Sequence, residues 1–357
     1  MRKGILCLLS ALLLLGAYPR ACAEGEPEIS ARCAVLTGPE GQILYARNAD
    51  ERRLIASTTK LMTALVTAEY CDGAEIVEIP ASCCGIEGSS LYLSPGERYT
   101  VEELLTGLLL VSANDAAQAL ALHCAGSTEA FAALMNEKAA ALGMNSSHFV
   151  NPHGLNAEGH YGSASDLAKL MAACMDVPAL AAILGESSAS VKEQTIYNHN
   201  KLLWRCPGCL GGKTGYTQAA GRCLVSCCQR EGTRLYCATL SAPDDWNDHL
   251  ALYDWGFARY ETRNVTEDLR LTVPLLTDPP SEIAVEAEPL RLFLPKGAEI
   301  TLRAELPRFV FPPVKAGQTA GLVTVLADGD ERGRSPLRFA ESVPEGAEAP
   351  EPGRRTT

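Results

Sequence analysis

Hydrophobic residues in the first half of the chain recur every three or four positions, the spacing that places them on one face of a helix. The predicted helices cover residues 61–68, 101–111, 116–124, 128–142 and 165–175. Thr100 and Glu103 form a capping-box pattern before the second helix, and Gly126 and Gly143 end the third and fourth. Residues 144–162 are rich in Asn, His and Gly, which predicts a loop.

From residue 210 the hydrophobic pattern changes to strict alternation, which is typical of strands. Strands are predicted at residues 34–36, 43–46, 212–217, 222–228 and 235–240, and an amphipathic helix at 249–260. The first two and the last three strands are expected to share one antiparallel sheet, with the helices between them. Residues 24–262 are therefore predicted to form an α+β domain in which a helical cluster is inserted into the sheet.

The chain beyond residue 264 is rich in strands and turns. Short apolar segments at 269–273, 284–287, 290–294, 300–306 and 322–326 are separated by Pro- and Gly-containing turns. We expect a small all-β domain over residues 263–343. Residues 344–357 are rich in Pro, Glu and Gly and are predicted to be a disordered tail.

The first residues have the features of an export signal. Arg2 and Lys3 precede a short apolar stretch at 5–17, and Ala21-Cys22-Ala23 offers a cleavage site of small residues. Residues 1–23 are therefore predicted to be a signal peptide, and the protein to be exported to the cell envelope or secreted. An uncleaved membrane anchor is the alternative, although the stretch is short for a span of about 20 residues.

Charge and cysteine content limit the function further. The chain has 31 basic and 43 acidic residues in 357 and no basic run, which excludes nucleic acid as a partner. Twelve of its 14 cysteines follow the leader. Most of them lie in apolar segments of the sequence, where Cys acts as a small hydrophobic residue. Cys206-Pro-Gly-Cys209 is a candidate local disulfide. The His and Cys spacings fit no zinc site, so no metal or cofactor is predicted.

Ser57 and Lys60 are the first candidates for chemistry. They stand at positions i and i+3 at the start of a predicted helix, hence on one face. A serine becomes a strong nucleophile when a base lies within hydrogen-bond reach, and a lysine is such a base when burial or a nearby cation lowers its pKa. The pattern alone is common enough to occur by chance, so it needs further support.

Two more motifs supply that support. Ser112-Ala113-Asn114 follows an apolar helix, and Lys213-Thr214-Gly215 lies on a predicted strand. Lys213 would lower the pKa of Lys60 and attract an anion, while the Thr214 hydroxyl would bind a terminal carboxylate and Gly215 would let a substrate backbone approach the strand. Ser112 would relay a proton to the leaving amine, and Asn114 would hold Lys60 or the substrate amide.

The three motifs, in this order, are the signature of penicillin-binding proteins and class A β-lactamases, except that Ala113 replaces the usual Asp. The chain resembles the D-alanyl-D-alanine carboxypeptidases, the low-molecular-mass penicillin-binding proteins. The resemblance extends over nearly the whole mature chain and is carried by the runs at 55–63, 112–116, 151–155 and 212–217, with Ala220-Gly221 following the last of them, and by the turn at 311–318.

This resemblance implies a transpeptidase-like catalytic domain followed by a β-rich domain. It also implies hydrolysis of the terminal D-Ala of peptidoglycan stem peptides through an acyl-enzyme on Ser57, which β-lactam antibiotics would also acylate. The family's oxyanion hole corresponds to the backbone N–H groups of Ser57 and Tyr216.

Two departures from the family pattern stand out. The acidic segment 242–248 lacks the Arg that many members use to bind the substrate carboxylate. Arg222 could replace it, although a salt bridge on the strand face is the simpler interpretation. The tail at 350–357 is neither amphipathic nor apolar, so no C-terminal anchor is seen, and membrane association stays open.

Two other functions remain as alternatives. A β-lactamase would need a deacylating carboxylate, for which Glu158 and Asp166 are the nearest acids, and neither stands in the expected context. A non-enzymatic sensor of penicillin or muropeptides would keep the fold and lose the chemistry. His153 is interpreted as a structural residue of its loop.

Overall fold

The computed structural model describes residues 25–345, and the chain divides into two compact units at Ala258 and Arg259. The predicted leader lies outside the described residues, as does the predicted tail apart from its first two residues. Within residues 25–345 no single helix has both the length and the apolarity to cross a membrane. Only one sharply bent pair, α5 and α6 (Ala164–Met175 and Pro178–Gly185), meets these measures when taken together.

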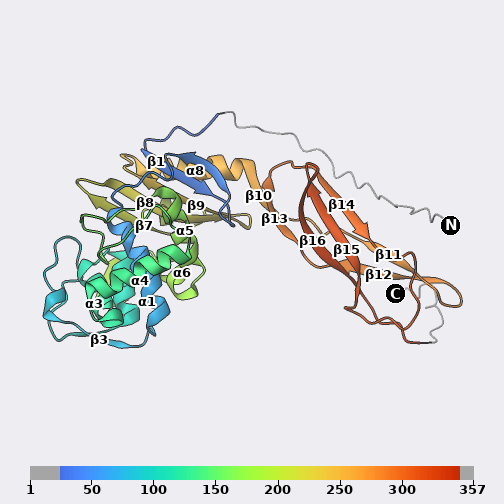
Figure 1. Ribbon diagram of the computed structural model, residues 1–357, viewed down its shortest axis with the longest axis horizontal. Coiled ribbons are helices and arrows are strands. Elements are labelled where there is room, and N and C mark those ends of the chain that lie inside the picture. Colours follow the sequence, from blue (N-terminus) through green and yellow to red (C-terminus); the bar gives the residue numbers. More distant parts are fainter. Residues whose placement is uncertain (1–24, 346–357) are drawn as a thin grey trace. The chain divides into compact units, whose positions relative to one another are not determined.

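The first unit is built on a five-stranded antiparallel sheet in the order β2-β1-β9-β8-β7. Its strands are β1 (Cys33–Thr37), β2 (Ile43–Arg47), β7 (Cys209–Thr217), β8 (Gly221–Arg230) and β9 (Thr233–Leu240). The chain leaves the sheet after β2 and returns at β7, which confirms the predicted insertion of helices between strands (Figure 1). Since β7 ends the order, its outer edge pairs with no other strand of the described chain.

Both faces of this sheet are covered. Ser226 of β8 bonds to His249 and Tyr253 of helix α8 (Asp245–Arg259), at 2.7 Å in each case. The neighbouring residue Val225 points to the opposite face and joins the core cluster that also contains Leu170 of α5. The alternation along β8 therefore places α8 and the helical cluster on opposite faces.

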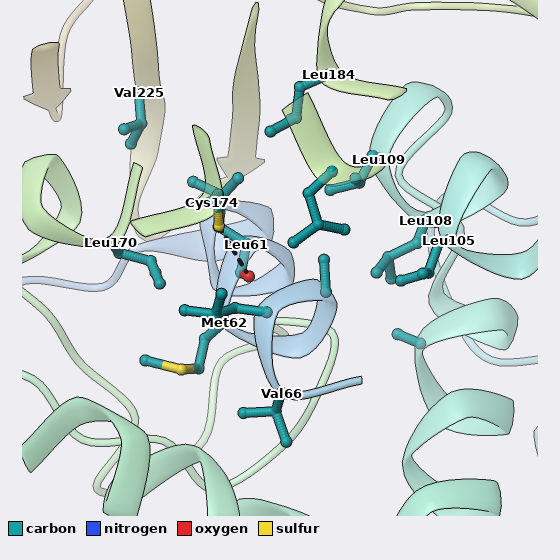
Figure 2. Packing of buried hydrophobic residues seen from close by; sticks show 14 of the residues in the cluster. Leu61, Met62, Val66, Leu105, Leu108, Leu109, Leu170, Cys174, Leu184 and Val225 are labelled. Atoms are coloured by element: carbon teal, nitrogen blue, oxygen red, sulfur yellow. Dashed lines mark hydrogen bonds between the residues drawn. The ribbon is translucent and has the colours of Figure 1, made fainter. Parts of the chain in front are cut away.

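The inserted cluster surrounds helix α1 (Lys60–Tyr70), which is buried over its first eight residues. Figure 2 shows Leu61, Met62 and Val66 of α1 between leucines of α2 and residues of α5. The other elements are η1 (Ala56–Thr59), β3 (Ile76–Glu78), η2 (Ala81–Cys83), β4 (Arg98–Thr100), α2 (Val101–Leu110), α3 (Asn114–Ala125), α4 (Thr128–Ala141), β5 (Ser188–Val191), β6 (Gln194–Tyr197) and α7 (Leu202–Arg205). The predicted capping box is present, because Thr100 and Glu103 each accept from the other's backbone N–H.

The second unit is a β structure with a core of its own. Strands β11 (Leu271–Leu275), β12 (Ser281–Ala287), β14 (Ile300–Glu305), β15 (Thr319–Ala327) and β16 (Asp330–Phe339) form one sheet, while β10 (Tyr260–Asn264) pairs with β13 (Arg291–Pro295). Val273, Ile283, Val285 and Leu337 alternate inward and are buried. No helix occurs between residues 260 and 345, in agreement with the predicted β-rich composition.

The cysteine prediction was wrong at its one specific pair. Cys206 and Cys209 are thiols, as are the other ten cysteines of the described chain. The Cys206 sulfur lies 3.8 Å from that of Cys228 on β8, whereas the Cys209 sulfur approaches Asn200 and the Gly211 carbonyl. The turn between the two cysteines leads into β7, and their side chains have different neighbours.

Candidate active site

The turn that carries Ser57 packs against Gly154. Ala56 has a φ of +47°, and Ile55 O accepts bonds from Thr58 N (3.2 Å) and Thr58 Oγ1 (2.6 Å). Gly154 lies against this turn so closely that a Cβ at that position would be 2.0 Å from Ala56 O. Ser57 is thus presented from a fixed 3-10 turn at the head of α1.

Lys60 lies directly behind Ser57 and is completely buried. Its Nζ donates to three oxygens: Ser57 Oγ at 3.0 Å, Asn114 Oδ1 at 2.7 Å and the His153 carbonyl at 2.6 Å. Burial lowers the pKa of Lys60 well below its usual value, and the charge of Lys213 lowers it further, while Asp115 opposes the change. The arrangement supplies a nitrogen able to be neutral beside a serine hydroxyl.

The second motif lies at the break between α2 and α3. Ser112 has a φ of +64° and is 5% exposed, and Asn114 is the first residue of α3. Asn114 also bonds outward, since its Nδ2 donates to the Glu87 carbonyl and its N to the Ser89 carbonyl. Ala113, where the signature has Asp, is fully buried.

Asp115 is a site residue to which sequence reasoning gave no role. Its buried carboxylate accepts from Ser90 Oγ (2.6 Å), Leu91 N (3.0 Å) and Leu93 N (3.0 Å). Together with Asn114 it fastens the segment 87–93 to the start of α3. The available signal was an acid in the first turn of an otherwise apolar helix, which a helix dipole favours.

The third motif runs along β7, beside the Ser57 turn. A Cβ on Gly215 would lie 3.0 Å from Ser57 N, so any larger residue there would require the turn to shift by a few tenths of an ångström. Lys213 is 1% exposed and donates to the Thr214 carbonyl at 2.9 Å, and burial lowers its pKa to about 7. Tyr216, by contrast, has an exposed side chain. The free edge of β7 is therefore available to an extended chain next to Ser57.

Three of the four remaining candidates have structural partners. Arg222 forms a salt bridge with Asp245 (2.7 Å), as the simpler interpretation expected. Asp166 accepts from Ser146 N and Ser147 Oγ, and Glu158 is exposed. The ring of His153 accepts from Leu155 N, and burial lowers its pKa to about 4, so its part beside Lys60 is played by the backbone carbonyl.

His160 is a second residue that the sequence did not single out. Its Nδ1 accepts from Val150 N, so the proton resides on Nε2, which faces Thr59 Oγ1 at 2.8 Å. Burial lowers its pKa to about 4, which keeps the ring neutral. This bond ties the loop 150–160 to the end of η1.

Comparison with known proteins identifies the family of this chain. The family model described as D-alanyl-D-alanine carboxypeptidase, Peptidase S11, matches residues 20–244. The chain belongs to this family. It is 30% identical to D-alanyl-D-alanine carboxypeptidase DacF of Bacillus subtilis over 96% of this chain and 95% of that one. It is 31% identical to DacA of Escherichia coli over 90% and 86%.

A solved structure agrees with this assignment. Penicillin binding protein 5 from Haemophilus influenzae has a TM-score of 0.69 and 29% identity, and the match covers 90% of this chain and 100% of that one. These matches confirm three predictions: the family, the α+β fold with a C-terminal β region, and a serine carboxypeptidase activity in peptidoglycan metabolism.

Proposed function

We propose that this chain removes the terminal D-alanine from peptidoglycan stem peptides through an acyl-enzyme on Ser57. The observation that carries the proposal is the contact of 3.0 Å between the Ser57 hydroxyl and the buried Lys60 amine, whose pKa is lowered. A neutral Lys60 accepts the Ser57 proton as Oγ attacks the carbonyl carbon of the scissile amide.

The substrate lies along the edge of β7 in this proposal. Its carbonyl oxygen, which is negative in the tetrahedral intermediate, accepts hydrogen bonds from the backbone N–H groups of Ser57 and Tyr216. Its terminal carboxylate binds Lys213 and Thr214. The 3.0 Å separation between Ser57 N and a Cβ position on Gly215 supports this placement, because it sets the strand edge beside the nucleophile.

Departure of the leaving group requires a proton on its nitrogen. Ser112 passes the proton from Lys60 to the amine of the departing D-Ala, and Asn114 holds Lys60 in place during the transfer. Water then hydrolyses the ester on Ser57 by the reverse relay. A β-lactam acylates the same serine, with the difference that its amine stays attached to the acyl group.

The catalytic part is proposed to comprise residues 24–262, with a separate β-rich domain at 263–343, and the two compact units support this division. The substrate lies outside the cytoplasmic membrane, and the leader pattern at 1–23 supports export to the cell envelope.

The test is incubation of the pure protein with a peptide ending in D-Ala-D-Ala, followed by quantification of free D-Ala and of bound labelled penicillin. We expect one D-Ala per peptide and a penicillin adduct that lasts for minutes. Ser57→Ala should abolish both, while Ser82→Ala, in the other 3-10 helix, should keep both. Rapid penicillin turnover would indicate a β-lactamase instead, and penicillin binding without D-Ala release a sensor.

A further inference from the structure

Two half-buried cysteines lie in contact at the far ends of the helices that form the candidate active site. Cys71 directly follows α1, and Cys124 is in the last turn of α3. Their sulfur atoms are 2.7 Å apart, although the residues are 53 positions apart in the sequence. Two non-bonded sulfur atoms normally stay well beyond this distance, so the fold brings the two thiols to within bonding reach.

The pair differs from the other cysteines of the described chain. The next sulfur pair, Cys206 and Cys228, is separated by 3.8 Å. The buried thiols Cys174 and Cys223 approach backbone carbonyls instead. Nothing in the proposed reaction uses Cys71 or Cys124, so their contact needs an explanation of its own.

We propose that Cys71 and Cys124 are a modification site, which an external disulfide oxidises to a disulfide bond between α1 and α3. The Cys71 thiolate, from the less buried residue, attacks the external disulfide and releases one thiol. The Cys124 thiolate then attacks the Cys71 sulfur of the mixed disulfide and releases the second. Two electrons pass to the external disulfide, which becomes two thiols, and both cysteine protons leave with them.

Burial makes both steps of this exchange slow. It raises the pKa of Cys71 and, more strongly, that of Cys124. The thiolate fractions at neutral pH are therefore small, and exchange depends on a reactive partner disulfide. Export to an oxidising compartment would supply such partners.

The position of the bond gives it a structural consequence. At their other ends the same two helices are joined by the 2.7 Å bond from Lys60 to Asn114. The bridge would close a loop that contains β3, β4, α2 and the segment 87–93, and would hold the helix pair at both ends. Closing a loop of this length in a unit of this size is expected to raise Tm by about 5–10 °C.

A metal ion is the competing occupant of this corner. Cys71, Glu75 and His123 place their ligand atoms within 4.8 Å of one another, and His123 Nε2 lies 3.0 Å from Glu75 Oε2. Two thiolates on one tetrahedral zinc ion, however, lie about 3.7 Å apart. The sulfur contact is shorter than that, and Cys124 is not part of the three-residue group. The geometry therefore favours the disulfide.

The experiment treats the full-length exported protein with oxidised glutathione, blocks free thiols by alkylation, and maps the peptides by mass spectrometry. We expect a linked pair of peptides containing Cys71 and Cys124, and a higher Tm that dithiothreitol reverses. Cys71→Ser should lose the linked peptides and the Tm rise. Cys84→Ser, which removes another half-buried thiol, should keep both.

Two results would overturn the proposal. One is alkylation of both Cys71 and Cys124 in wild-type protein after oxidation. The other is one zinc ion per chain, measured after dialysis against zinc, that protects both thiols and is lost in Cys71→Ser and in His123→Ala. The wild-type peptide map is decisive by itself if a variant fails to fold.

Discussion

Replacing Gly154 by alanine tests whether the loop 151–154 positions Ser57. Gly154 has a φ of +86°, and a Cβ there would meet Ala56 O at 2.0 Å, Ala56 C at 2.5 Å and Thr59 Oγ1 at 2.8 Å. Two of these atoms are backbone atoms of the turn that carries the nucleophile. The turn and the loop must therefore separate for the methyl group to fit.

The cost has two parts that can be distinguished. An alanine in the left-handed region costs about 1–2 kcal/mol by itself. Relief of the clash requires a shift of about 1 Å, and a displacement of that size in a catalytic group can reduce the rate about 100-fold. The first part affects stability alone, whereas the second reaches Ser57.

Gly159→Ala is the matched control. Gly159 belongs to the same loop and has a φ of +78°, but the nearest atoms to its Cβ position are 3.7 and 3.8 Å away. Both variants are expected to lower Tm, the control by about 2–8 °C. Only Gly154→Ala is expected to slow acylation by fluorescent penicillin, by about 100-fold. Equal acylation rates in the two variants would refute the positioning argument.

Two further predictions concern charge and the segment 87–93. In the proposed reaction Lys213, whose pKa burial lowers to about 7, binds a carboxylate only when protonated, so kcat/KM should fall as pH rises through that value. Lys213→Arg should move this limb up by several pH units, since Arg stays charged, and an unmoved limb would show that another group titrates. Asp115→Asn should cost about 1–3 kcal/mol, because Leu91 N and Leu93 N donate to different carboxylate oxygens and the amide nitrogen would face one of them. Thermal unfolding and the rate of proteolysis at 87–93 measure this loss of stability. Asp254→Asn, at an exposed carboxylate, is the control, and equal stability of the two variants would contradict the prediction.

Elements with a long, consistent pattern were predictable from the sequence. The capping box that opens α2 and the alternation along β8 both fix local structure by side-chain chemistry alone. The region between Met175 and Cys209 was left unassigned. Its helix α6 is apolar on all sides, and its hairpin β5–β6 has strands of only four residues, so neither shows a clear period.

The site was predictable to the extent that its residues stand in short motifs. Lys60 bonds to both Ser57 and Asn114, so the first two motifs meet in the structure. The supporting contacts were not predictable, because they join distant backbone groups. Gly154 contacts Ala56 across a long stretch of chain, and the acid at position 115 does not by itself indicate that the segment 87–93 is its partner.

In the proposed reaction, the lack of an Arg at 242–248 makes Lys213 the central charge of the site. Arg222, the nearest candidate replacement, is neutralised by Asp245, and burial leaves Lys213 on the margin of protonation near pH 7. A carboxylate bound beside Lys213 raises its pKa and so fixes its charge. That charge in turn lowers the pKa of Lys60 and keeps the base neutral at the moment when Ser57 must lose its proton. Binding of the substrate carboxylate at Lys213 would then help Lys60 to activate Ser57. A substrate without a carboxylate should therefore lose kcat as well as affinity.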